Sequence, residues 1–440
     1  MRMKRIYLFL TIICLTVQSV SAAAQTAQSM RLGIDEMFAL ADENNASIRG
    51  FRHAESAAAE AVKTARNDRL PSIEFSASAS LLGDGRLWDR DFSNGMNAPI
   101  PRFGNNFALE AAQVIYAGGA VAAGVAMSEL KLQSTQAEAE QNRQNIRFLL
   151  VGNYLELCKL DNQTEVYRKN IEQTQRLLAD IRARRQEGLA IRNDITRYEL
   201  QLQRLGLALT QTENSRAIIN DRLATALGLD PKQRIEPDRT IIESLPSVQS
   251  ESQWQQTAAE APSMRLASLG VAQSRQAIKL AQAERIPSIS LFAGDHLDGP
   301  ITIEVPPLNK NFNYWYVGVG LNFNISSLYK SGRNVRRAKF ASQQAEAFEQ
   351  LAAENLQSDV REAYIRFDEA FTACRMQEKN LELAEQNYEV VHNRFLNDLA
   401  LITDMLDADN AKLSAELDVA NARIGILFNY YRLQKVTGNL

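Results

Sequence analysis

The chain has 440 residues, 21 glycines, 11 prolines and a formal net charge of −3 at pH 7, and no Pro/Gly-rich linker divides it. This mildly negative charge provides no broad basic field, which disfavours nucleic-acid binding. The three histidines are scattered, no Cys/His metal spacing occurs and no nucleophile motif has the context it needs. We therefore expect no enzyme, no cofactor and no metal site.

The N-terminus has the pattern of a secretory signal, which we place at residues 1–24. Three cations precede an apolar run, Ile6 to Val17, and small residues suited to a signal peptidase follow at Ser21-Ala22-Ala23-Ala24. Cys14 follows bulkier residues than a lipidated cysteine normally does, which favours a cleaved signal. No other stretch has about 18 consecutive apolar residues, so any membrane span of the mature chain must consist of strands.

Two helices are predicted next. Leu32 to Glu43 is amphipathic, and Ala46 to Arg69 is rich in alanine until Pro71 ends it. After the proline the period changes to two, which predicts a strand with one apolar and one polar face. Its apolar positions alternate with serine and glutamate, and they are Ile73, Phe75, Ala77 and Ala79.

The segment that leads into this strand occurs twice, because Arg69-Leu70-Pro71-Ser72-Ile73 recurs as Arg285-Ile286-Pro287-Ser288-Ile289. A single repeat this long exceeds solenoid periods and indicates two copies of one large unit. We divide the mature chain into a first repeat, 25–235, and a second repeat, 236–440. Each is predicted to run helix, proline, strand, loop, strand, glycine turn, very long helix, turn and long helix.

The second repeat starts with a helical segment from Gln253 to Arg285, in which Pro262 suits the first turn of a second helix. In both repeats a polar loop follows the first strand, and alternation then resumes. These second strands are predicted around Phe107 to Ile115 and Val317 to Ile325.

Tyr314, Trp315 and Tyr316 lie at one end of the last strand, where an aromatic girdle would meet the membrane interface. The alternative is that these rings cover a soluble hairpin. Four strands of about 10 residues each match outer-membrane strands, but about eight strands are needed to close a barrel. The chain must then oligomerise to bury the edges of its sheet.

After Gly118-Gly119, and again after Gly332, the sequence is helical and lacks proline until about Gln186 and Leu396. Helices of about 65 residues would each be about 100 Å long. The returning helices carry coiled-coil seams, so each long helix is predicted to fold back on its successor. The seam residues are Ile195, Tyr198, Leu202, Leu205 and Leu209 in the first repeat, and Leu406, Leu413, Leu417, Ala420, Ile424, Leu427 and Tyr431 in the second.

Together these features resemble the TolC-type outer-membrane efflux proteins. The residues that carry the resemblance are the duplicated strand starts, the Tyr-x-x-Gly strand exits at Tyr116 to Gly119 and Tyr329 to Gly332, and the helical turns Glu187 to Ala190 and Asn397 to Asp404. The resemblance covers essentially the whole mature chain.

The resemblance implies a mainly α fold with a transmembrane β-barrel. In that family a homotrimer closes a twelve-stranded barrel in the outer membrane, with an α-helical tunnel in the periplasm. The implied function is a passive exit duct that works with a periplasmic adaptor protein and an inner-membrane pump. The alternative, from another functional class of protein, is a periplasmic or surface coiled-coil scaffold or adhesin. Its strands would form a small soluble sheet.

The two helical turns and the residues near them supply two groups of candidate site residues. Asp398, Asp404, Asp407 and Asp409 cluster there, and threefold symmetry would turn inward-facing acids into a ring of charge. In the family, acids at the matching positions line a closed gate, and Asp404 and Asp407 match best. The alternative is that Asp404, like its repeat partner Asp194, only stabilises the first turn of a helix.

The second group consists of residues that resemble the adaptor-docking turns of the family, although plain exposed turn residues remain the alternative. Asp398 departs from the glycine found in the first repeat, which puts the geometry of the second turn in question. The docking candidates are Arg184, Gly188, Leu189 and Ala190 in the first repeat, and Arg394, Leu399 and Ala400 in the second.

Overall fold

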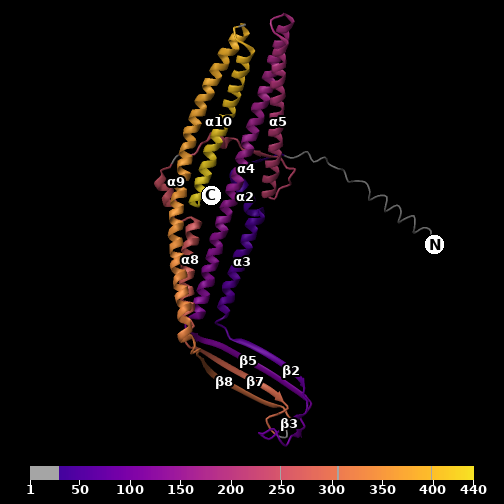
Figure 1. The fold of residues 1–440 in the computed structure, drawn as a ribbon, viewed down its shortest axis with the longest axis vertical. Coiled ribbons are helices and arrows are strands. Elements are labelled where there is room, and N and C mark those ends of the chain that lie inside the picture. Colours follow the sequence, from indigo (N-terminus) through magenta and orange to yellow (C-terminus); the bar gives the residue numbers. More distant parts are fainter. Residues whose placement is uncertain (1–28, 248, 305–306, 398) are drawn as a thin grey trace, which may run out of the picture.

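The computed structural model describes residues 29–247, 249–304, 307–397 and 399–440. The predicted signal segment and Cys14 lie outside the described residues. Long helices form an elongated layer, and a sheet extends from one end of it (Figure 1). The helices are α2 (Ile34–Asn44), α3 (Ala46–Asn67), α4 (Ala120–Gln186), α5 (Arg192–Ala226), α6 (Thr240–Glu243), α7 (Glu251–Ala258), α8 (Pro262–Ala283), α9 (Ser327–Leu396) and α10 (Ile402–Thr437).

The long helices have the predicted lengths and ends. Helix α4 has 67 residues and α9 has 70, and they end at Gln186 and Leu396. Helix α8 begins at Pro262, as predicted, because the fixed φ of proline suits the first helical position. Asn45 starts α3, since its side chain accepts hydrogen bonds from the backbone N–H groups of Ser47 and Ile48.

The main sheet is antiparallel with the order β2-β5-β7-β8, so strands from both halves of the chain pair through β5 and β7. Two small sheets, β1-β6 and β3-β4, were not predicted. The strands are β1 (Met30–Leu32), β2 (Ser72–Leu81), β3 (Gly85–Leu87), β4 (Met96–Ala98), β5 (Phe103–Ala117), β6 (Ile235–Pro237), β7 (Ser288–Gly299) and β8 (Phe312–Asn322).

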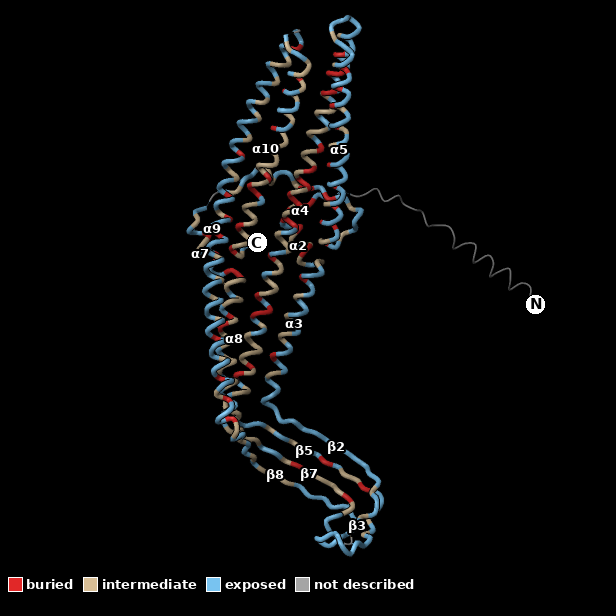
Figure 2. The backbone as a smooth tube through the Cα atoms, in the orientation of Figure 1, coloured by how far each residue is buried: buried red, intermediate tan, exposed pale blue. Residues whose placement is uncertain are grey.

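The main sheet has one apolar and one polar face, because successive side chains in a strand point to opposite sides. On the apolar face the large side chains are exposed to solvent in the single chain, unlike the core of a soluble sheet (Figure 2). They include Ile73, Phe75, Leu109, Leu291, Trp315, Val317, Val319 and Leu321.

The predicted aromatic girdle is wrong for two of its three residues. Trp315 lies on the apolar face and is 75% exposed, whereas Tyr314 and Tyr316 lie on the polar face. Adjacent residues of one strand cannot share a face.

The prediction that the second strand exit lies at Tyr329 to Gly332 is also wrong. Strand β8 ends at Asn322 and α9 begins at Ser327, so Tyr329 and Gly332 lie inside the helix. Ser327 N donates to Asn324 O in the turn between them. A glycine within a helix of 70 residues costs only about 1 kcal/mol and does not break it.

In both halves the element order is two helices, two long strands and two long helices. The bounds of the repeats, 25–235 and 236–440, stay a prediction, and the boundary between them lies within β6. Helix α10 packs against both α9 and α4. Its most buried residues therefore include Met405, Ala408 and Ile426 beside the predicted seam residues Ile424 and Leu427. Among the described residues, no helix is both long and apolar enough to cross a bilayer.

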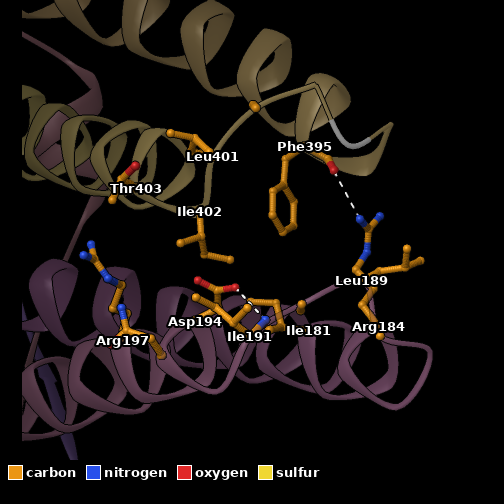
Figure 3. Close-up of a pocket in the computed structure, with 14 residues that line it drawn as sticks. Ile181, Arg184, Leu189, Ile191, Asp194, Arg197, Phe395, Leu401, Ile402 and Thr403 are labelled. Atoms are coloured by element: carbon orange, nitrogen blue, oxygen red, sulfur yellow. Dashed lines mark hydrogen bonds between the residues drawn. The ribbon is translucent and has the colours of Figure 1, made fainter.

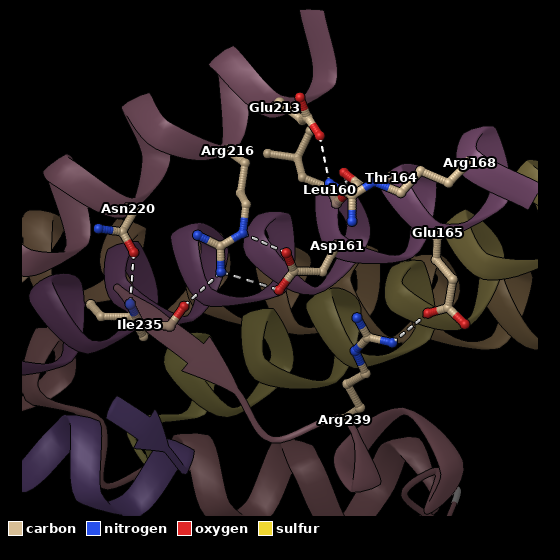
Figure 4. A network of polar contacts seen from close by, with 10 residues as sticks. All are labelled: Leu160, Asp161, Thr164, Glu165, Arg168, Glu213, Arg216, Asn220, Ile235 and Arg239. Carbon is tan, nitrogen blue, oxygen red and sulfur yellow. Dashed lines mark hydrogen bonds and ion pairs between the residues drawn. The ribbon is translucent and has the colours of Figure 1, made fainter. Parts of the chain in front are cut away.

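A polar network fixes β6 against the long helices near the middle of the layer (Figure 4). The guanidinium of Arg216 on α5 donates to both carboxylate oxygens of Asp161 on α4 and, at 2.8 Å, to the carbonyl of Ile235. Asn220 accepts a hydrogen bond from Ile235 N at 2.8 Å. The Arg216 and Asp161 side chains are only 10% and 11% exposed, so they form a nearly buried ion pair.

Replacing Asp161 by alanine is expected to destabilise the folded protein by about 3 kcal/mol, because Arg216 is left buried without its counter-ion. Thermal unfolding of the detergent-purified protein measures this loss. Glu165→Ala is the matched control, since it removes the exposed ion pair with Arg239 in the same network and should cost less than about 1 kcal/mol. Equal losses of unfolding free energy in both variants would contradict a larger contribution from the buried Arg216–Asp161 pair.

Candidate functional site: the helical tips

The tip of the first helical hairpin is a tight turn closed by backbone hydrogen bonds. Leu189 N donates to Arg184 O at 2.9 Å, and Gly188 N donates to Arg185 O at 3.1 Å. Gly188 has a φ of 79°, a conformation that glycine adopts without strain. The glycine therefore suits the conformation of the turn itself, whether or not a partner binds there.

The second tip has the equivalent of the first of these hydrogen bonds. Leu399 N donates to Arg394 O at 2.8 Å, and the Arg394 guanidinium donates to Leu399 O at 3.2 Å. Arg394 thus stabilises its own turn. Asp398, the residue that departs from the first repeat, lies outside the described residues.

Arg184 joins the two tips, a role that sequence analysis missed. Its guanidinium donates to the carbonyls of Phe395 and Leu396 at 3.3 and 2.9 Å, and lies 5.1 Å from the centre of the Phe395 ring (Figure 3). These carbonyls belong to the C-terminal end of α9, where the helix dipole favours a cation. Arg184 therefore stabilises the contact between the hairpins.

The two tips are also held together by an apolar core, the tip core, and they border a groove of about 490 Å³ (Figure 3). Ala190 and Ala400 pack against the tip core, whereas Leu189 and Leu399 are exposed. The docking candidates thus differ in their surroundings, and the two leucines remain accessible to a partner. The tip core consists of Leu177, Leu178, Ile181, Ile195, Tyr198, Phe395 and Met405.

Asp404 and Asp407 lie on the exposed side of the first two turns of α10, while Met405 and Ala408 between and beside them are buried. Asp404 also accepts a hydrogen bond from Leu401 N at 3.1 Å. Asp194 accepts the same bond from Ile191 N at 3.1 Å in the first repeat. Both Asp404 and Asp194 therefore stabilise the start of a helix.

Asp409, which the sequence grouped with these acids, lies elsewhere. Its side chain is directed between the helices, where the Tyr198 hydroxyl of α5 donates to it at 3.4 Å. Burial raises the pKa of Asp409 to about 6, and the Tyr198 hydrogen bond and the nearby Lys412 oppose this increase. Asp409 is five positions beyond Asp404, which turns it toward another side of the helix.

Polar side chains from all four long helices surround this acid. Gln201 on α5 donates to Asn410 on α10 at 2.7 Å, and Gln173 on α4 donates to the hydroxyl of Tyr388 on α9. Tyr388 contacts the Lys412 ammonium at 4.5 Å from its ring centre and stacks on His392. These side chains form a polar cross-link between the hairpins next to the tip core, on its side away from the tips. The spacing of apolar residues along one helix could not predict this cross-link, because the side chains that form it come from different helices.

Similarity to known proteins decides which family the chain belongs to. A family model described as outer membrane efflux protein matches residues 38–229 and 254–439. The chain belongs to this family. The two matched segments include the long helices and the four strands of the main sheet.

This efflux protein is also similar to outer membrane protein TolC of Vibrio cholerae serotype O1, with 22% identity over 96% of this chain and 94% of that protein. Among solved structures, VceC from Vibrio cholerae superposes with a TM-score of 0.76 and 16% identity over 92% of this chain and 96% of VceC. The CmeC outer membrane channel of Campylobacter jejuni superposes with a TM-score of 0.74 and 15% identity over 92% and 85% of the two chains.

The family establishes an outer-membrane efflux channel rather than an enzyme. It also decides against the coiled-coil scaffold or adhesin that the sequence left open, and it confirms the predicted location in the outer membrane. The roles of single residues at the tips are not decided by family membership.

The contact between the hairpins of this efflux protein is expected to strengthen in acid. Because burial raises the pKa of Asp409 above its ordinary value, the packed state binds the proton more tightly than the separated state does. Packing is therefore favoured as the pH falls through about 6 and weakened above it. Between pH 7.5 and 5 we expect opening of residues around Tyr198 to become roughly tenfold rarer, measured by hydrogen exchange corrected for intrinsic rates.

Asp409→Asn mimics the protonated side chain and should show the same low opening at both pH values. Asp407→Asn is the matched control, because this neighbouring acid is exposed and should leave the wild-type response unchanged. A response that persists in Asp409→Asn would contradict the assignment of the pH dependence to Asp409.

Proposed function

We propose that three copies of this chain form a homotrimeric exit duct for drugs, toxic ions or secreted proteins. The duct would close a twelve-stranded barrel in the outer membrane and continue as a helical tunnel in the periplasm. A periplasmic adaptor protein and an inner-membrane pump would supply energy and selection. The observation that carries this proposal is a sheet that exposes one apolar face and both of its edges.

Strands β2 and β8 form the edges of the sheet, and within the described residues each pairs with one neighbour only. In lipid, unpaired backbone groups on such edges are costly, so the sheet must close. Four strands are too few for a barrel of about eight or more, whereas three copies supply twelve. Closure would pair β8 of one copy with β2 of the next.

The helices support the same arrangement. Their lateral order is α9, α10, α4 and α5, so α5 and α9 are the outer helices of the layer (Figure 1). Both carry exposed apolar residues at heptad-like intervals, which suits coiled-coil packing against another helix. These residues are Leu200, Leu207 and Ile218 on α5, and Ile365, Met376, Leu383 and Val390 on α9.

Leu200 and Val390 lie at similar heights, each within about 12 Å of its helix end at the tip. We expect a Leu200→Cys/Val390→Cys variant to form disulfides between chains and to migrate as a trimer without reductant. Light scattering of the detergent-extracted complex should give the mass of three chains. The pair Leu200→Cys/Ile365→Cys is the matched control, because Ile365 lies too far from the tip to meet Leu200. A monomeric mass, or equal cross-linking of both pairs, would reject the trimer.

The exposed leucines beside the tip groove are the proposed docking site of the adaptor. A photo-cross-linking residue at Leu189 should capture the adaptor in cells, and Gly188→Ala should greatly reduce the capture by distorting the turn. Ser215 is the control position, because it is also exposed, is not among the apolar residues assigned to the contact between copies, and lies about 35 Å along α5 from the tip. Capture that persists at the unmodified level in Gly188→Ala would count against docking at this turn.

A further inference from the structure

The polar face of the sheet carries a continuous series of aromatic rings, the ring ladder. Its members, in spatial order, are Phe312, Tyr314, His296, Tyr316 and Phe292. The centres of successive rings lie 5.4, 5.2, 5.6 and 5.9 Å apart. The first four rings are nearly parallel, and the last pair meets edge to face. The ladder combines residues of β7 and β8.

Glycines opposite the rings allow this arrangement. A Cβ atom at Gly294 would lie 2.5 Å from the Tyr316 ring, and one at Gly318 would lie 2.6 Å from the Phe292 ring. Any larger residue would push these rings away from the sheet. The glycines therefore let the Tyr316 and Phe292 rings lie close against the backbone.

Carboxylates flank the ring ladder on the same face. Glu110 Oε1 lies 3.5 Å from His296 Nε2, and the Tyr314 hydroxyl donates to Asp298 at 3.5 Å. The Glu110 side chain is 56% exposed, so it can also meet a ligand. The four strands of the main sheet contain acidic residues but no lysine or arginine. The face thus combines aromatic rings with carboxylates.

We propose that the ring ladder binds aromatic organic cations. A flat cation can stack on the exposed rings, and Glu110 and Asp298 attract its charge, whereas an aromatic anion of similar shape is repelled. The proposal rests on the proposed function, because trimer closure turns the polar face of the sheet toward the channel. It assigns to the barrel wall a preference for one substrate class.

The test uses the full-length protein in planar bilayers. Ethidium is added on the side of the loops that join the strands, away from the helices. Block of the single-channel current gives a half-blocking concentration. Glu110→Gln/Asp298→Asn should raise this concentration about tenfold, because the charge attraction is lost. Tyr314→Leu should also raise it, since it interrupts the ladder. Anilinonaphthalene sulfonate, an aromatic anion, should block far more weakly than ethidium.

Asp295→Asn is the matched control, because Asp295 is an acid of the same strand on the opposite face. It should leave the half-blocking concentration unchanged. If the carboxylate variant does not assemble, Tyr314→Leu decides alone. A conducting channel that ethidium does not block, or equal block of all variants by ethidium, overturns this inference only. A protein that forms no conducting channel overturns the proposed function as well.

Discussion

An arginine in place of Ala77 is expected to prevent stable assembly in the membrane. Ala77 is exposed in the middle of β2, opposite Phe107 on the apolar face of the sheet. In an outer-membrane strand, arginine at the bilayer midplane costs about 2–4 kcal/mol per chain. Three copies in one barrel would lose about 6–12 kcal/mol, which approaches the whole stability of a protein. The fraction of protein recovered as trimer from purified outer membranes measures the effect.

Ser76→Arg is the matched control, because Ser76 is the adjacent residue on the polar face. It introduces the same charge in the same strand, and Glu74 and Glu110 lie on its side of the sheet. We expect trimer recovery close to that of the unmodified protein. Equal losses in both variants, or normal recovery of Ala77→Arg, would mean that the apolar face does not contact lipid.

The second large effect is expected at the tips. Replacing Asp404 and Asp407 by asparagine in three copies would remove six carboxylates from the proposed gate ring. A ring of charge binds cations at a constriction, so the block of the channel by divalent cations should weaken about tenfold and the conductance should rise. Single-channel recording in planar bilayers measures both. Asparagine can still accept the hydrogen bond from Leu401 N, so the start of α10 is preserved.

Asp194→Asn separates the gate from the alternative helix-start role. Asp194 accepts the equivalent hydrogen bond from Ile191 N, so this variant likewise removes the charge of an acid at a helix start and keeps the hydrogen bond. If Asp404 only stabilised its helix, the two variants would have similar effects on the channel. A conductance change in Asp194→Asn as large as that in the double variant would reject the gate.

The ends of the long helices and the strands of the main sheet could be predicted because they depend on local chemistry. Pro71 and Pro262 act on the chain within one or two residues, and the periods of 2 and 3.6 are properties of a single segment. The same local reasoning misplaced the start of α9, because one glycine was taken as a turn. The surrounding residues of that segment favour a helix strongly enough to continue through Gly332.

The candidate site was predicted only in part. The positions of Gly188 in the first tip and of the exposed Asp404 and Asp407 after the second tip could be predicted from the order of residues along each hairpin. Their roles in docking and gating stay predictions. Arg184 was assigned to an external partner, although its guanidinium bonds the end of α9. Asp409 was grouped with the exposed acids because nothing along the chain signals the proximity of Tyr198.

A duplicated chain of about 100 Å helices and four two-faced strands could thus be predicted from the amino-acid sequence, because period, proline and glycine act over a few residues. The family could be predicted as well, through motifs that occur in the same order twice. Which side chains meet became visible in the folded chain: Tyr198 with Asp409, Arg184 with the carbonyls of α9, and the rings of β7 with those of β8. These contacts depend on the relative register of distant segments, which packing and strand pairing set when the chain folds.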